Sequence, residues 1–162
     1  MEYAHIMPED ILKNPEVKVY VEAGNSCLGA LGFTEHGRPH AKRCSNYARN
    51  ILEALDYDKR TCELAAIAGY LHDIGNLVNR VDHSQSGAVM AWSILNDMGC
   101  DPAEIATIVT AIGNHDEGNG VPVTYVSCTP VKLHPIALSV ERARRLPLWR
   151  VVEIASGHNV HL

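Results

Sequence analysis

Apolar and small residues recur every three or four positions along much of the chain, which is the pattern of amphipathic helices. In the segment 39–55, for example, they fall at Ala41, Cys44, Ala48 and Leu52. The same spacing continues through three later segments. The pattern predicts four successive helices, over residues 39–55, 59–73, 83–98 and 102–114.

Start and stop residues support these boundaries. Asp58 and Asp82 stand where an N-cap is needed, and Gly75 and Gly99 close the same two helices. The run Asp101-Pro102-Ala103-Glu104 is the strongest cap in the chain, because Pro suits the first helical position and Glu the third. Short turns join the helices in pairs. The prediction is therefore an all-α bundle of two antiparallel helical hairpins with flanking helices.

The flanking segments carry weaker signals. Asn14 and Pro15 start a further predicted helix that Gly32 ends. Residues 118–129 are β-branched and rich in turn residues, so we expect a loop or a short strand pair that covers the site described below. Residues 135–146 have a helix-like pattern.

Composition limits the class of protein without choosing a function. A chain of 162 residues, 46% hydrophobic, predicts a single domain over residues 1–162. The net charge of −5 argues against general affinity for nucleic acid. No apolar run of membrane-spanning length and no signal-peptide pattern is found, so we expect no membrane association and a cytoplasmic location. Five cysteines without a Cys-x-x-Cys pair indicate reduced thiols. The protein is either a monomer or a homodimer.

Histidines stand at the ends of both predicted hairpins. His40 opens the first hairpin and His72 closes it, while His83 opens the second and His115 closes it. At a rise of about 1.5 Å per residue, arms of similar length return the chain to its starting level. The short link from Asp73 to His83 keeps both open ends on the same side of the bundle. The sequence therefore predicts that four histidines and Asp73 converge on a metal site.

The ligand types limit the choice of metal. Imidazole and carboxylate, without thiolate in the motifs, favour Mn, Fe, Co, Ni or Zn over Ca. Five ligands exceed the usual three-ligand catalytic zinc site, so one or two divalent ions are expected, and two would lie about 3.5–4 Å apart. In the two-ion arrangement Asp73 bridges, His40 and His72 complete one position, and His83 and His115 complete the other.

Four motifs in order carry a resemblance to a known family. His40-Ala-Lys-Arg43, Leu71-His-Asp-Ile-Gly75, His83-Ser-Gln-Ser-Gly-Ala88 and Ile112-Gly-Asn-His-Asp-Glu117 resemble the motifs of the HD superfamily of metal-dependent phosphohydrolases, in its dinuclear branch. That branch includes cyclic-dinucleotide phosphodiesterases and hydrolases of dinucleoside polyphosphates. The resemblance covers residues 34–120, whereas residues 121–162 diverge from the family. It implies cleavage of a phosphate ester or phosphoanhydride of a small nucleotide or related metabolite by metal-activated water.

The resemblance and the residue chemistry assign roles around the metal. Asp73 acts with the ions on the attacking water. Asp116 either orients that water or protonates the leaving oxygen, or it is simply a turn residue. Arg80, and Arg43 from the first hairpin, are candidates to bind phosphate, although Arg43 has an acidic neighbour as an alternative partner. Asn76 is a candidate substrate contact. It occupies a position where the cyclic-dinucleotide branch often has lysine, which counts against that substrate.

One departure from the family keeps two other functions open. The superfamily closes its site with an aspartate on a later helix, and this chain has no aspartate after Asp116. Glu141 either replaces it or is an exposed residue beside Arg142, Arg144 and Arg145; we favour the exposed residue. The alternatives to a phosphohydrolase are an oxygen-activating di-iron enzyme of HD type and a catalytically impaired module that binds phosphate or nucleotide.

Overall fold

The computed structural model describes residues 2–116 and 148–157, and these residues fold into helices. Their only β-type pairing is an isolated bridge between Ala4 and Cys100. The helices, in chain order, are α1 (Pro8–Lys13), α2 (Pro15–Ala30), α3 (Arg38–Ala54), α4 (Lys59–Leu71), the 3-10 helix η1 (Ile74–Leu77), α5 (His83–Asp97), α6 (Pro102–Gly113) and α8 (Leu148–Ser156). The all-α prediction is confirmed.

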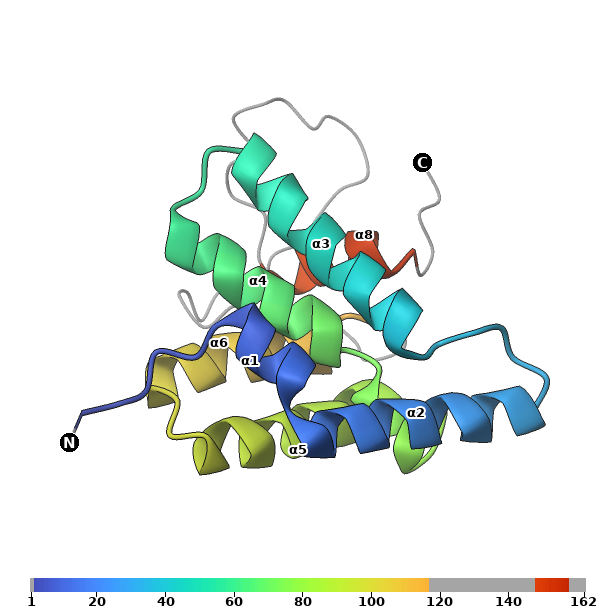
Figure 1. Cartoon of the computed structure of the whole chain (residues 1–162). Helices are drawn as coiled ribbons and strands as arrows, with labels where there is room; N and C mark the ends of the chain where they lie inside the picture. The colour runs from blue at the N-terminus through green and yellow to red at the C-terminus, as the bar shows by residue number, and fades with distance from the viewer. Residues whose placement is uncertain (1, 117–147, 158–162) are drawn as a thin grey trace.

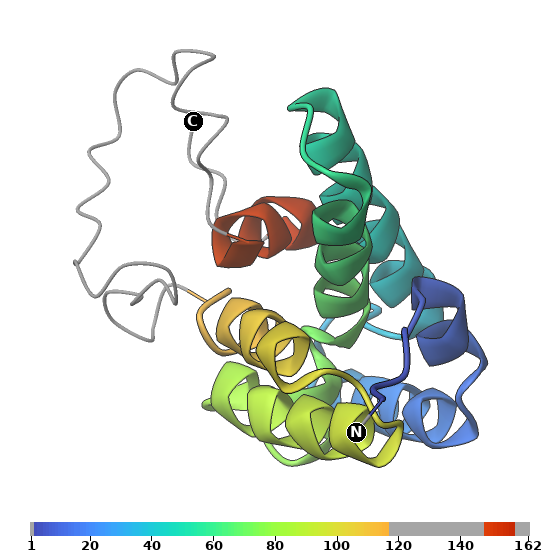
Figure 2. The same cartoon turned by 90° about the vertical axis from the view of Figure 1, so that its left-hand side faces the viewer.

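Two helical hairpins form the centre of the bundle (Figure 1). Helix α3 packs along α4, and α5 packs along α6. Helix α2 lies beside η1, and α8 packs against α3, α4 and α6 (Figure 2). The predicted pair of hairpins with flanking helices is therefore confirmed.

Helix α4 is deeply buried, and every residue from Cys62 to Leu71 belongs to the interior. Its neighbours α1, α3, α6 and α8 surround it. Small residues let them approach closely: a Cβ on Gly69 would lie 2.9 Å from the carbonyl oxygen of Cys44 on α3. Burying each Leu or Ile in such a core contributes about 1.5–3 kcal/mol, so α4 is a rigid base for the residues that follow it.

Side-chain caps hold several helix starts as predicted. Asp58 accepts a hydrogen bond from the backbone N–H of Thr61, and Asp101 accepts one from the N–H of Ala103. Asp82 is different, because its side chain makes no cap hydrogen bond. Its backbone has a φ of 56°, in the left-handed region, which aspartate tolerates better than most residues. Asp82 therefore supports the turn into α5 through its backbone conformation.

The end of α4 also differs from the prediction. The helix stops at Leu71, and Gly75 lies in η1 without a left-handed backbone. A Cβ on Gly75 would overlap the carbonyl oxygen of His83 and lie 2.5 Å from the backbone nitrogen of Gly87. Glycine is needed here because η1 packs directly on the backbone of α5, a tertiary contact that the sequence pattern does not reveal.

The short α1 and the late α8 were not predicted from the sequence. The expected loop or strand pair at 118–129, the helix-like segment 135–146 and Glu141 lie outside the described residues. Within the described ranges, no helix combines the length and apolarity needed to cross a membrane.

Candidate metal centre

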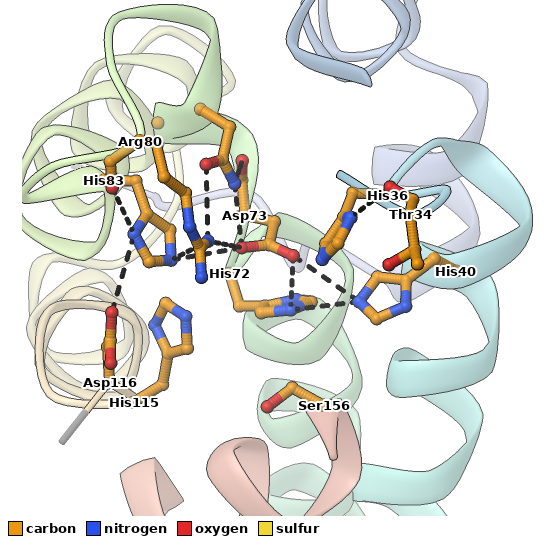
Figure 3. Close-up of polar contacts among 12 residues, drawn as sticks. Thr34, His36, His40, His72, Asp73, Arg80, His83, His115, Asp116 and Ser156 are labelled. Atoms are coloured by element: carbon orange, nitrogen blue, oxygen red, sulfur yellow. Dashed lines mark hydrogen bonds and ion pairs between the residues drawn. The ribbon is translucent and has the colours of Figure 1, made fainter. Parts of the chain in front are cut away.

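The five predicted metal ligands lie together at one end of the hairpins (Figure 3). His40 is in the first turn of α3, and His72 follows the last residue of α4. Asp73 precedes η1, His83 is the first residue of α5, and His115 comes two residues after α6. Five structural elements thus bring five potential ligands to one place, as the lengths of the hairpin arms predicted.

Asp73 lies at the centre of this cluster. Its Oδ2 is 3.0 Å from Nε2 of His72 and 3.4 Å from Nε2 of His40, while its Oδ1 is 3.2 Å from Nε2 of His83. Ligand atoms of His72, Asp73 and His115 lie within 4.8 Å of one another, and the His115 ring centroid is 5.1 Å from that of His83. The two carboxylate oxygens therefore face different histidines.

Backbone carbonyls fix the orientation of three of the rings. In His72, His83 and His115, Nδ1 lies 2.6–3.1 Å from the carbonyl oxygen of the residue three positions earlier. A carbonyl oxygen can only accept a hydrogen bond, so Nδ1 carries the proton in each ring. When such a ring is neutral, Nε2, which is turned toward the cluster in His72 and His83, keeps its lone pair, as in metal-binding histidines held by outer partners.

The ionisation of these groups suits a cation. Burial disfavours the charged form of Asp73, but the charge on His72 and hydrogen bonds from His40, His72 and His83 overcome it and hold the pKa of Asp73 well below its usual range. Burial also opposes protonation of His72, yet the Asp73 carboxylate raises its pKa. Burial, followed by the charge on His72, lowers the pKa of His115 to about 3. The cluster thus contains an ionised carboxylate and a neutral imidazole, the forms that bind metals.

The donor set fits a divalent metal. Oδ2 of Asp73 is buried, and the Nε2 atoms of His72 and His40 lie 3.0 and 3.4 Å from it. When the rings of His72 and His83 are neutral, their Nε2 lone pairs face the carboxylate oxygens of Asp73. Electron pairs at this separation repel unless a proton or a cation lies between them. A metal ion would displace that proton and satisfy both groups, so the residues present fit a metal site.

Asn76 and Arg80 surround the carboxylate on its other side. The amide of Asn76 donates to Oδ1 of Asp73 over 2.9 Å and to the backbone oxygen of Asp73 over 3.0 Å. Its own amide oxygen accepts from Arg80 over 3.4 Å. Asn76 is buried, and its observed contacts are with Asp73 and Arg80. The tight turn of η1 directs the amide toward the carboxylate that it orients, and the expected contact of Asn76 with substrate stays a prediction.

Arg80 is a basic residue in direct contact with the cluster. Its guanidinium lies 3.9 Å from Oδ1 of Asp73 and 3.3 Å from Nε2 of His83, and it stacks over the ring of Phe33 at 5.6 Å. The side chain is 27% exposed, so it is both held in place and accessible. This position is compatible with the predicted phosphate contact, which stays a prediction.

The other two candidates lie farther from Asp73. Arg43 is exposed and forms an ion pair with Glu35 at 3.5 Å, the acidic-neighbour alternative considered above. Asp116 is partly exposed at the edge of the cluster, with Oδ2 3.7 Å from Nδ1 of His83. Its roles in orienting water or protonating a leaving group remain predictions.

Comparison with known proteins agrees with this architecture. No family model matches the chain. The chain is 30% identical over 106 residues to an uncharacterized protein of Methanocaldococcus jannaschii. The match covers 56% of this chain and 40% of the relative's length, so this chain spans less than half of that relative. It superimposes with a TM-score of 0.55 on the crystal structure of a predicted HD superfamily hydrolase from an uncultured Thermotogales bacterium, at 21% identity, covering 92% of this chain and 71% of the other. The chain has the fold of that predicted hydrolase.

Within this fold, two residues near the ligands were not predicted from the sequence as members of the site. Cys44 lies one helical turn after His40, and its Sγ is 3.4 Å from His40 Nε2. Burial, then the charge on Asp73, raises the pKa of the Cys44 thiol to about 12. The spacing of four residues from His40 was the available signal, but Cys44 was interpreted as a packing residue. Ser156, at the end of α8, lies below the histidine cluster in Figure 3, and its hydroxyl donates to the backbone oxygen of Glu153; no motif marked it.

Proposed function

We propose that the protein is a metal-dependent phosphohydrolase that cleaves a phosphate ester or phosphoanhydride of a small nucleotide or related metabolite. One observation carries the proposal: a buried, ionised Asp73 faces histidine nitrogens with both of its carboxylate oxygens, and an accessible Arg80 lies beside it. This arrangement offers ligands for cations and a donor for phosphate within one cluster. The proposal concerns this chain alone, which spans 40% of the length of the relative from Methanocaldococcus jannaschii.

The ligands divide into two groups around Asp73. Oδ2 faces His40 and His72, and Oδ1 faces His83, with His115 near both His72 and His83. We propose that each group holds one divalent ion, from the set Mn, Fe, Co, Ni and Zn. Such ions, when bound, activate a water molecule and neutralise the charge on a phosphate.

Residues around the proposed ligands hold them in a fixed arrangement. Backbone carbonyls keep the ring orientations of His72, His83 and His115 fixed before any ligand binds. Asn76 fixes Oδ1 of Asp73 by donating to it, so that the carboxylate cannot rotate away from the histidines. This prior ordering reduces the reorganisation needed during the reaction.

Arg80 is the residue proposed to bind the phosphate. A guanidinium presents several N–H donors in one plane, which matches two phosphate oxygens. Contacts to Phe33 and Asn76 hold the Arg80 side chain toward the cluster. Asp116, at the edge, is proposed to orient the attacking water or to protonate the leaving oxygen. The Arg80 contact favours phosphate chemistry over the oxygen-activating alternative.

A phosphate-release assay tests the proposal. Protein loaded with each candidate metal is supplied with nucleoside mono-, di- and triphosphates, dinucleotides, sugar phosphates and pyrophosphate. We expect release from at least one nucleotide and its loss in Asp73→Asn, with oxygen consumption at background. Oxygen consumption by the iron-loaded protein without phosphate release would support the di-iron enzyme. Phosphate binding without turnover under any metal would support the impaired binding module.

A further inference from the structure

Cys44 has the position of a metal ligand as well as that of a core residue. It is buried, and its Sγ lies 3.4 Å from Nε2 of His40. One ligand atom from each of His40, Cys44 and His72 lies within 4.8 Å of the others. The close packing of Gly69 against the Cys44 backbone explains the proximity, because it brings α3 directly onto the end of α4.

The distances match those of one tetrahedral ion. With Zn–N and Zn–S bonds of about 2.1 and 2.3 Å, two tetrahedral nitrogens lie about 3.4 Å apart, and a nitrogen and a sulfur about 3.6 Å apart. Nε2 of His40 is 3.4 Å from Nε2 of His72 and 3.4 Å from Sγ of Cys44. Oδ2 of Asp73 lies 3.4 and 3.0 Å from the two nitrogens. Nε2 of His40, Nε2 of His72 and Sγ of Cys44 are therefore close enough to share one ion, and Oδ2 of Asp73 lies beside the two nitrogens.

The other buried cysteines have different surroundings. Sγ of Cys62 lies 3.7 Å from the carbonyl oxygen of Tyr57, and Sγ of Cys100 lies 3.8 Å from a carboxylate oxygen of Glu104. Neither contact involves a histidine. Cys62 is thus a matched control for Cys44, since the two residues sit buried on the facing helices α3 and α4.

We propose that Cys44 is a fourth protein ligand for thiophilic ions at the position formed by His40, His72 and Asp73. A tetrahedral zinc held by four protein ligands keeps no open coordination position, as in structural zinc sites. Manganese prefers oxygen and nitrogen ligands and leaves the thiol unused. Zinc binding exchanges the S–H bond for a Zn–S bond and releases one proton to water. Zinc would then occupy the centre tightly and inhibit it, while manganese supports turnover.

This inference rests on the proposed function only because both require the metal site. Its test therefore measures metal binding by the thiol directly. Full-length wild type, Cys44→Ser and Cys62→Ser are titrated with Co²⁺ as a spectroscopic probe and then with Zn²⁺ in competition. We expect a thiolate-to-cobalt charge-transfer band in wild type and Cys62→Ser but not in Cys44→Ser. The Cys44→Ser protein should bind zinc at least about tenfold more weakly. Its zinc-loaded form should regain phosphate release.

Several results would overturn this inference. One is cobalt binding by wild type without a thiolate band, and another is a band that survives in Cys44→Ser. Both would leave the proposed hydrolase intact, whereas failure of wild type to bind any divalent ion would overturn both proposals. If Cys44→Ser does not fold, zinc X-ray absorption on wild type decides. One sulfur scatterer at about 2.3 Å is expected, and a shell of nitrogen and oxygen alone contradicts the proposal.

Discussion

Replacing Gly75 by alanine should disrupt the junction between η1 and α5. The added Cβ would overlap the carbonyl oxygen of His83 and approach the backbone nitrogen of Gly87 to 2.5 Å and the hydroxyl of Ser86 to 2.6 Å. The Ser86 hydroxyl can rotate away. The two backbone atoms cannot move without displacing η1 from α5, so no small side-chain rearrangement near Gly75 can relieve the clash.

The cost can be estimated from these contacts. Adding a methyl group to a well-packed core costs about 1–3 kcal/mol, and rigid backbone neighbours place Gly75→Ala at about 3 kcal/mol. For a chain of this size, about 2–4 °C per kcal/mol gives a loss of roughly 6–12 °C in Tm. His83 would also move relative to Oδ1 of Asp73, which now lies 3.2 Å from its Nε2. Metal bound at His83 should therefore weaken as well.

Urea unfolding and a metal titration measure both effects, with Gly29→Ala as the control. Gly29 lies in α2, and a Cβ there would meet nothing within 4 Å. Helix propensity predicts that Gly29→Ala leaves stability unchanged or raises it by up to about 1 kcal/mol. If Gly75→Ala is as stable as Gly29→Ala and binds metal normally, the close packing of η1 on α5 does not position the site as described.

Three further predictions concern charged residues. Asp73→Asn should keep the helical circular dichroism of wild type but lose metal in elemental analysis; retention of full metal content would refute the assignment. Arg80→Met should raise KM at least about tenfold with unchanged metal content, and an unchanged KM would argue against a phosphate contact. Glu104→Gln should cost about 1.5–3 kcal/mol at pH 7, because hydrogen bonds from Arg60 lower the pKa of Glu104. Because the folded pKa of Glu104 is lowered, the stabilisation is present above the unfolded pKa of about 4.3 and is lost as pH falls through the lower folded pKa. The difference from wild type should therefore shrink on acidification.

The sequence was sufficient to predict the hairpins and the grouping of ligands. Caps such as Asp58 and Asp101 act locally, and the N–H groups that they accept from lie within three residues. Similar arm lengths then brought His40 and His72 together without any knowledge of side-chain packing. Local signals and simple geometry were enough for these features.

Tertiary contacts decided what the sequence could not show. Gly75 had the pattern of a helix stop, but its requirement for glycine comes from α5, a separate element. Cys44 is small and apolar, so its place on a buried helix face is equally consistent with packing and with ligation. Ser156 belongs to α8, which packs against α3, α4 and α6 although it follows residues 117–147 in the chain. No local pattern encodes such an approach.

Anomalous diffraction from crystals grown with Mn²⁺ tests the central claim most directly. The account predicts two peaks about 3.5–4 Å apart. One should be bonded to His40, His72 and Oδ2 of Asp73, and the other to His83, His115 and Oδ1 of Asp73. A single peak on His40, His72 and Asp73 would contradict the two-ion arrangement. Peaks that avoid Asp73, or no peak in this cluster, would contradict the metal centre itself.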